Sequence, residues 1–237
     1  MDDSKSLNKF IAETGFCSRR QADNYIEEGR VTINGVVAKK GNRVMPCDEV
    51  LLDSKPLVKK PELLYLVLNK PPGVTCTTDL RDPDNIISFL NFSERIFPVG
   101  RLDKMSEGLI LLTNDGDIVN KILRSRNEHE KEYIVYVNSP ITSEFIRNMS
   151  SGVPVLETMT KPCFVEKLGT NSFRIILTQG LNRQIRRMCD YLGYHVTRLK
   201  RIRIMHIYLQ DLPSGKWRSL TPEEVALLYD QVQNSEK

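Results

Sequence analysis

Long hydrophobic runs, paired cysteines and clustered histidines are all missing from this sequence of 237 residues. No apolar stretch approaches the roughly 20 residues that a membrane-spanning helix needs, so we expect no membrane partner. The five cysteines include no Cys-x-x-Cys pair, and the N-terminus has no apolar signal segment. We therefore expect reduced thiols and a cytoplasmic location. The three histidines show no metal-ligand spacing, and we expect no metal.

Acidic residues are scarce in one part of the chain. The net charge is +4 over the whole, yet residues 178–218 carry seven arginines and two lysines against two aspartates. A local excess of this kind suits a polyanion such as nucleic acid. The alternative at this stage is an ordinary solvated surface.

Helix and turn signals near the N-terminus predict a small folded unit. Ser18, with Gln21 three residues further on, forms a capping box, which is typical of a helix start. Asn34-Gly35 stands between two short apolar runs and predicts a β-hairpin. Two helices, a hairpin and short strands are therefore expected here.

A polar stretch with two prolines, residues 55–61, follows this unit and predicts a linker. We expect one domain of residues 1–58 and a second, larger domain of residues 59–237. With 40% hydrophobic residues, the chain can bury a core in each.

The segment of residues 100–109 holds a carboxylate, Asp103, between a glycine-bounded loop and an apolar run typical of a buried strand. Gly100 and Gly108 permit a tight turn or a close backbone approach. A reactive carboxylate needs firm support of this kind. By loop chemistry alone, however, such an aspartate more often forms an Asx-turn or a helix cap.

Arg186 lies in a predicted basic helix that Asn182 is suited to cap. Apolar residues at i, i+3, i+4 and i+7 predict the buried face of this helix: Ile185, Met188, Cys189 and Leu192. Arg186 follows Ile185 by about 100°, so it is expected at the edge of that face, where it can reach into a cleft. Arg183 and Arg187 are expected to point away from it.

Sequence motifs in both predicted domains resemble known families. Ser-Arg-Arg-Gln-Ala-Asp at 18–23 and Glu-Gly-Arg-Val-Thr-Ile-Asn-Gly at 28–35 resemble the S4 RNA-binding domain. Gly-Arg-Leu-Asp-x-x-Ser-x-Gly-Leu around Asp103 resembles the catalytic motif of the RsuA-type ribosomal RNA pseudouridine synthases. That family usually has threonine at the position of Ser106, and both residues carry a hydroxyl.

Three further motifs follow the order of the same family. Asn-Lys-Pro at 69–71 resembles its first motif. Lys-Glu-Tyr, ending at Tyr133 about 30 residues after Asp103, resembles the motif whose tyrosine stacks on the target base. Gly-Leu-Asn-Arg-Gln-Ile-Arg-Arg-Met, which contains Arg186, resembles the third. The residues of these segments are most similar to those of the F-type subgroup, which acts on large-subunit ribosomal RNA.

The resemblance implies roles for individual residues. Asp103 is expected to be the nucleophile, Arg186 to pair with it, and Tyr133 to stack on the uracil and assist proton transfer. Four residues are expected to line the substrate pocket: Arg101, Leu102, Ile185 and Lys70. For Lys70 we expect a mainly structural role, which shapes the floor of the cleft. Basic residues of both domains are expected to contact RNA: Lys9, Arg19, Arg20, Arg30, Arg183 and Arg187.

The implied reaction is the isomerisation of uridine to pseudouridine in 23S ribosomal RNA. The bond from ribose to N1 breaks, the uracil rotates, and a bond to C5 forms. We expect no cofactor, a monomer, and ribosomal RNA or a ribosome-assembly intermediate as partner. The implied fold class is α+β, with an S4-like domain and a catalytic domain built on a mixed, mostly antiparallel sheet with flanking helices.

Three alternatives remain open from the sequence. The same chemistry could act on a tRNA or on small-subunit ribosomal RNA. A non-catalytic S4-type RNA-binding protein would be expected to lack Asp103 or Arg186, and both are present. A methyltransferase would need a glycine-rich cofactor loop after a strand, and the sequence shows none.

Overall fold

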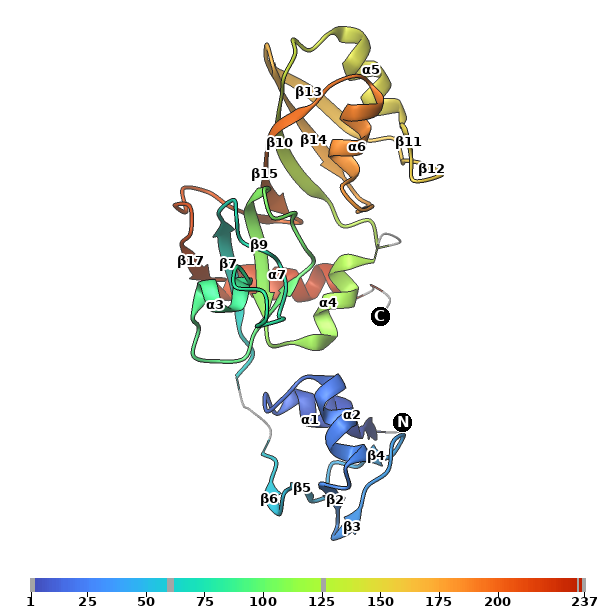
Figure 1. Ribbon diagram of the computed structural model, residues 1–237, viewed down its shortest axis with the longest axis vertical. Helices are drawn as coiled ribbons and strands as arrows, with labels where there is room; N and C mark the ends of the chain where they lie inside the picture. Colours follow the sequence, from blue (N-terminus) through green and yellow to red (C-terminus); the bar gives the residue numbers. More distant parts are fainter. Residues whose placement is uncertain (1–2, 59–61, 125–126, 234, 236–237) are drawn as a thin grey trace. The chain divides into compact units, whose positions relative to one another are not determined.

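The computed structural model describes residues 3–58, 62–124, 127–233 and 235, and the chain divides into two compact units (Figure 1). The smaller unit comprises residues 1–63 with the short segments 92–95 and 114–116, and the larger unit comprises the rest. The expected domain boundary, between residues 58 and 59, borders residues 59–61, which lie outside the described residues.

The smaller unit has two helices and short strands around one apolar core that includes Leu7, Ile11 and Ile26. Ser18 accepts a hydrogen bond from the Gln21 amide while its own amide donates to the Gln21 side chain, as the capping box predicted. Its elements are β1 (Lys5–Ser6), α1 (Leu7–Glu13), α2 (Arg19–Glu27), β2 (Val31–Ile33), β3 (Val36–Val37), β4 (Arg43–Val44), β5 (Val50–Leu52) and β6 (Lys55–Pro56).

Two tight turns shape the small sheet β3-β2-β5-β6. Asn34 and Gly35 have positive φ angles of 50° and 80°, and they close the predicted hairpin between β2 and β3. The linker prediction is wrong at Lys55 and Pro56, which form β6 against β5. Asp53 and Ser54 turn the chain back there, with φ angles of 49° and 61°. The sequence did not predict this left-handed turn.

The larger unit is built on a nine-stranded sheet in the order β13-β14-β10-β15-β9-β7-β17, with β16 beside β15 and β8 beside β9. Among the described residues, β15 and β9 pair in parallel and the other strands of this sheet pair antiparallel. The expected α+β class with a mixed, mostly antiparallel sheet is confirmed. The strands are β7 (Tyr65–Lys70), β8 (Phe97–Val99), β9 (Glu107–Thr113), β10 (Lys131–Val137), β13 (Phe164–Gly169), β14 (Ser172–Leu177), β15 (Val196–Ile204), β16 (Ile207–Tyr208) and β17 (Trp217–Ser219).

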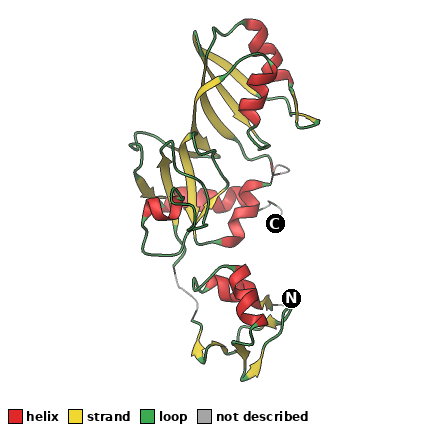
Figure 2. Cartoon of the chain, in the orientation of Figure 1, coloured by secondary structure: helices red, strands yellow, loops and turns green. Residues whose placement is uncertain are grey.

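Helices cover two separate parts of this sheet (Figure 2). The remaining elements are α3 (Ile86–Leu90), α4 (Gly116–Leu123), α5 (Ser143–Ser151), β11 (Pro154–Val155), β12 (Thr158–Met159), α6 (Gln184–Tyr191) and α7 (Pro222–Val232). One apolar core joins β10, β14 and the start of β15 to α5 and α6, and a second joins β7, β9 and the end of β15 to α4 and α7. None of the described helices is long and apolar enough to cross a membrane.

Gly108 allows the parallel strands to approach closely. It faces Arg201 across the β9–β15 pair, and its φ is +103°. A Cβ atom on Gly108 would lie 2.2 Å from the Arg201 carbonyl oxygen, so a larger residue cannot fit without moving the backbone. The predicted close approach at Gly108 is confirmed, and it fixes the loop before β9 to the long strand β15.

Candidate active site

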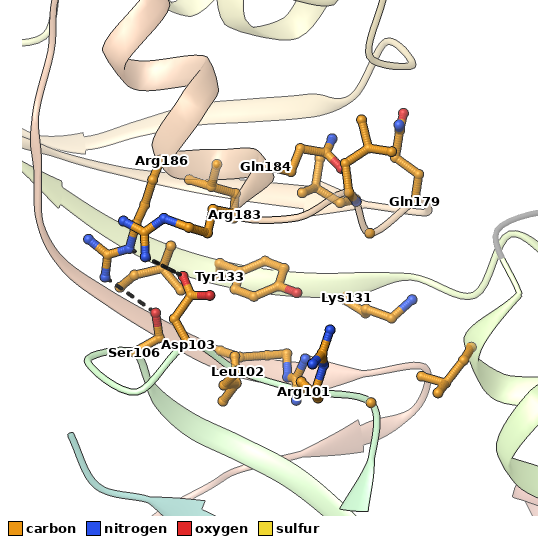
Figure 3. A pocket seen from close by; sticks show the side chains of 18 residues that line it. Arg101, Leu102, Asp103, Ser106, Lys131, Tyr133, Gln179, Arg183, Gln184 and Arg186 are labelled. Atoms are coloured by element: carbon orange, nitrogen blue, oxygen red, sulfur yellow. Dashed lines mark hydrogen bonds and ion pairs between the residues drawn. The ribbon is translucent and has the colours of Figure 1, made fainter. Parts of the chain in front are cut away.

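A cavity of about 270 Å³ opens where the loop before β9, strands β10 and β15, and the start of α6 meet (Figure 3). Six of the seven residues expected as catalytic or pocket residues line it: Arg101, Leu102, Asp103, Tyr133, Ile185 and Arg186. A second cavity, of about 790 Å³, is also lined by the Asp103 loop, so this loop borders both cavities.

Asp103 is held by the turn that the glycine-bounded segment forms. Its carbonyl oxygen accepts a hydrogen bond from the Ser106 amide at 2.9 Å. Gly100, with φ of +78°, packs so tightly that an added Cβ would lie 2.8 Å from a Leu123 methyl group. The side chain of Asp103 stays 30% exposed, so a substrate can reach the carboxylate.

Two arginines from the start of α6 converge on one carboxylate oxygen of Asp103. Arg186 Nε and Arg183 Nη1 each lie 3.5 Å from Oδ2 (Figure 3). At this distance the Arg186 Nε proton makes no hydrogen bond, so the contact is one of charge. The two arginines differ in freedom, because the Arg186 side chain is 13% exposed and that of Arg183 is 50% exposed.

Arg183 lies where the sequence did not place it. We predicted Asn182 as the cap of α6, and this prediction is wrong. Arg183 was expected to point away from the apolar face of α6. Its side chain is half exposed and lines the cavity, which the sequence did not predict. Arg183 itself is the N-cap residue, in a left-handed conformation with φ of 51°, and this backbone rotation carries its side chain into the cavity. Asn182 instead accepts from Arg187, through its carbonyl oxygen at 3.0 Å and its side chain at 3.3 Å.

Tyr133 lies on β10, directly between Ile175 of β14 and Arg201 of β15. Its ring is half-buried and faces the cavity beside Asp103 (Figure 3). The guanidinium carbon of Arg201 lies 6.0 Å from the ring centroid. The ring therefore offers an aromatic surface in the same cavity as the Asp103 carboxylate.

Lys70 does not line either cavity, which corrects its expected place in the substrate pocket. It is fully buried, and its ammonium donates to the carbonyl oxygens of Pro71, Val74 and Lys104. Burial lowers the pKa of Lys70. Lys70 ties the residue after Asp103 to the chain that follows β7, so it supports the loop from beneath.

The basic residues of the smaller unit that were expected to contact RNA fall into two groups. Arg30 is bound by the carboxylates of Asp53 and Glu28, which raise its pKa, and it stacks on Tyr25 at 4.4 Å. The others are less constrained: Lys9 lies 3.6 Å from Glu13, Arg19 approaches Ser6 at 3.5 Å, and Arg20 is exposed at the start of α2.

Several residues that line the cavity escaped the sequence analysis: Lys131, Gln179, Gln184 and Arg201. Lys131 lies two positions before Tyr133, and the alternation of a strand would have placed both on one face. For Arg201 no local signal exists, because only the register of β10 against β15 brings it beside Tyr133. Among the described residues, no group of histidine, cysteine and acidic side chains has the arrangement of a metal site.

Comparisons with known proteins define the class to which this fold and site belong. Residues 64–191 match the RNA pseudouridylate synthase family and residues 6–50 match the S4 domain. The chain belongs to the RNA pseudouridylate synthase family, an isomerase family whose substrate is RNA. The expected family and enzyme class are confirmed.

The chain is also similar to individual members of this family. The chain is 53% identical to the dual-specificity RNA pseudouridine synthase RluF of Escherichia coli K12, over 99% of this chain and 81% of that protein. It is 35% identical to the ribosomal large subunit pseudouridine synthase B of Bacillus subtilis, over 94% of each. A crystal structure of a pseudouridylate synthase matches this chain with 31% sequence identity and a TM-score of 0.69. The match covers 94% of this chain and 99% of that chain. The resemblance to the F-type subgroup is confirmed.

Proposed function

We propose that the chain converts a specific uridine of 23S ribosomal RNA to pseudouridine, with Asp103 as the nucleophile. The observation that carries this proposal is the accessible Asp103 carboxylate, aimed by Arg186 and flanked by Tyr133 in one cavity. A uridine in structured RNA must leave its stack before a side chain can reach its sugar, which costs a few kcal/mol. Basic surface around the cavity helps to offset that cost.

The reacting groups divide the work in this proposal. Asp103 attacks C1′ of the ribose or C6 of the uracil, or assists loss of the uracil to form a glycal. Arg186 holds the carboxylate in position. Tyr133 stacks on the flipped uracil and serves in proton transfer. Arg101, Leu102 and Ile185 complete the pocket wall.

The RNA contacts extend over both parts of the chain. We propose residues 1–58 as the RNA-binding domain and residues 59–237 as the catalytic domain. Basic residues that are exposed or partly exposed then supply contacts to phosphates, which add affinity but little sequence information: Lys9, Arg19, Arg20 and Arg187. We also propose a monomer that acts in the cytoplasm, where ribosomal RNA is available.

A second RNA substrate is the main alternative, and the names of the relatives bear on it. The 53% identical relative is called dual-specificity, and a 34% identical relative of Escherichia coli is called ribosomal small subunit pseudouridine synthase A. An additional tRNA site, or a small-subunit site, would use the same chemistry. The fit of RNA shape around the flipped base decides among these substrates.

Mapping of pseudouridine across total RNA tests this proposal. RNA is compared from cells with the gene intact, with the gene deleted, and with Asp103→Asn in its place. Loss of a 23S site in both altered strains supports the substrate and the nucleophile together. Loss of a tRNA or small-subunit site alone contradicts the substrate, and retention of every site by Asp103→Asn contradicts the nucleophile. No lost site on deletion would favour a role in RNA binding alone.

A further inference from the structure

Arg201 faces the cavity with part of its guanidinium unsatisfied. The residue is 3% exposed, and its Nε donates to the Leu109 carbonyl oxygen at 2.7 Å. Its Nη2 atom is buried and makes no hydrogen bond within the described part of the chain. A buried donor without a partner is costly, and a ligand that supplies the missing acceptor is one physical reason for it.

Lys131 presents a second buried cation to the same cavity. It is 8% exposed, and its ammonium donates to the carbonyl oxygen of His129 at 3.1 Å. No carboxylate of the described residues forms an ion pair with Lys131 or with Arg201. Burial and the nearby charge of Arg201 lower the pKa of Lys131 to about 8. The two residues flank Tyr133, one on its own strand and one directly across from it.

Arg203, two residues beyond Arg201 on β15, is a buried arginine that does have carboxylate partners. Its Nε lies 2.6 Å from Glu132 and its Nη2 lies 2.9 Å from Glu130. The cations that face the cavity have no such partners, although burial of an unpaired charge destabilises a fold. Their positive charge is therefore better explained by the substrate than by stability.

The reaction develops negative charge on the base. When the N1–C1′ bond breaks, its electron pair remains on the uracil, as an anion delocalised over N1, O2 and O4. The ribose C1′ then bonds to the Asp103 carboxylate, or the ribose gives its C2′ proton to that carboxylate and becomes the glycal. If the carboxylate first adds to C6, the electrons of the C5–C6 double bond move towards O4. Later, C5 bonds to C1′ as the bond from Asp103 to C1′ or C6 breaks, or as the glycal regains its C2′ proton. The proton leaves C5 and N1 takes one up, so the product is an isomer of the substrate.

We propose that Arg201 and Lys131 donate to a carbonyl oxygen of the uracil and stabilise the negative charge that this oxygen gains during the reaction. The inference rests on the proposed function of Asp103, and it holds for each of the three routes. A phosphate is a poorer candidate, because the pair is buried beside the ring of Tyr133. The exposed cations of the cavity, Arg101 and Arg183, are the ones open to the RNA backbone.

Single-turnover kinetics with the full chain test the proposal. The probe is an RNA stem-loop that carries the uridine found by mapping. Loss of one hydrogen bond to a charged group predicts that Lys131→Met lowers the rate at saturating RNA by about 10- to 100-fold. The matched control is Lys167→Met, on β13 outside the cavity, whose ammonium also donates to one carbonyl oxygen, that of Ile141. The control is expected to react at the wild-type rate.

Three results would overturn the proposal. One is a saturating rate for Lys131→Met equal to that of the control. Another is a weaker affinity and a reduced salt dependence of binding with an unchanged saturating rate, which would assign the pair to a phosphate. The third is a melting temperature for Lys131→Met well below that of wild type, which would indicate a structural role. We expect an equal or higher melting temperature, since a buried unpaired charge is removed.

Arg201 provides an independent arm. Arg201→Gln is expected to slow the saturating rate, and Arg201→Lys, which keeps the charge, is expected to recover part of it. Equal rates in both variants, each folded by circular dichroism, would contradict a role for the charge. A failure of the proposed function gives a different result. In that case Asp103→Asn would retain activity, irrespective of the rates of the Lys131 and Arg201 variants.

Discussion

Arg186 lies against Asp103 through its Nε atom, 3.5 Å from the carboxylate oxygen, and uses its two terminal nitrogens as anchors. Nη1 donates to the Val196 carbonyl oxygen at 3.1 Å and Nη2 donates to the Ser106 hydroxyl at 3.3 Å. Ser106 also donates its amide to the Asp103 carbonyl oxygen. One short turn thus positions both the carboxylate and its cationic partner.

Ser106 is therefore expected to act as a positioning residue. Ser106→Ala removes one anchor of Arg186, a hydrogen bond with a net value of about 1 kcal/mol, so the saturating single-turnover rate should fall about fivefold. Affinity for RNA should not change. Ser106→Thr keeps the hydroxyl and should react like wild type. A threonine variant as slow as the alanine variant would contradict this role.

Gly108 should be the least replaceable of the positive-φ glycines. Gly108→Ala adds backbone strain and a contact at 2.2 Å with the Arg201 carbonyl oxygen, so we expect a loss in the free energy of unfolding of at least about 3 kcal/mol. Gly73→Ala isolates the strain, because φ there is +91° with no atom within 4 Å, and about 1–2 kcal/mol is expected. Urea unfolding, followed by the fluorescence of the single tryptophan, Trp217, measures both. Equal losses would show that the strand contact is unimportant.

RNA affinity should separate the arginines of the smaller unit. Because Arg19 and Arg20 lie exposed at the start of α2, replacing both by glutamine should weaken RNA binding and reduce its salt slope by about two. Arg30→Gln should change affinity much less, since Asp53 and Glu28 already bind its guanidinium. Filter binding over a range of salt concentrations tests this, and an Arg30→Gln defect as large as that of the double variant would contradict it.

The stability of the larger unit should depend on the protonation of Lys131. The folded pKa of about 8 lies below the value of about 10.4 for an unfolded lysine, so between these values the unfolded chain binds more protons. Stability relative to Lys131→Met should therefore rise as the pH increases from about 8 to about 10, and stay level below about 7. Urea unfolding of both proteins across this range measures the difference. A difference that falls with increasing pH would contradict the assignment.

Local signals in the sequence predicted the parts of the fold that depend on neighbouring residues. The capping box at Ser18, the hairpin at Asn34-Gly35 and the close approach at Gly108 each follow from the chemistry of a few consecutive residues. The apolar stripe of α6 likewise placed Ile185 towards the core. The family motifs then located the segment around Asp103.

Residues placed by long-range packing could not be predicted in this way. Arg183 enters the cavity because one residue adopts a left-handed conformation, which its sequence gives no reason to expect. Lys70 was expected to line the substrate pocket, but the packing of β7 against the Asp103 loop buries it instead. Arg201 and Tyr133 become neighbours only through the register of two strands that are distant in sequence.

Pseudouridine formation by the purified chain tests most directly whether Asp103 is the nucleophile. Wild type, Asp103→Asn and Asp84→Asn are each mixed in excess with the RNA stem-loop, and pseudouridine is quantified over time. Asp84 is a matched control, because it pairs with Lys104 of the same loop and lies outside both cavities. We predict no product from Asp103→Asn, with RNA binding retained, and a wild-type rate from Asp84→Asn. Product formation by Asp103→Asn at a rate near that of wild type would contradict this assignment.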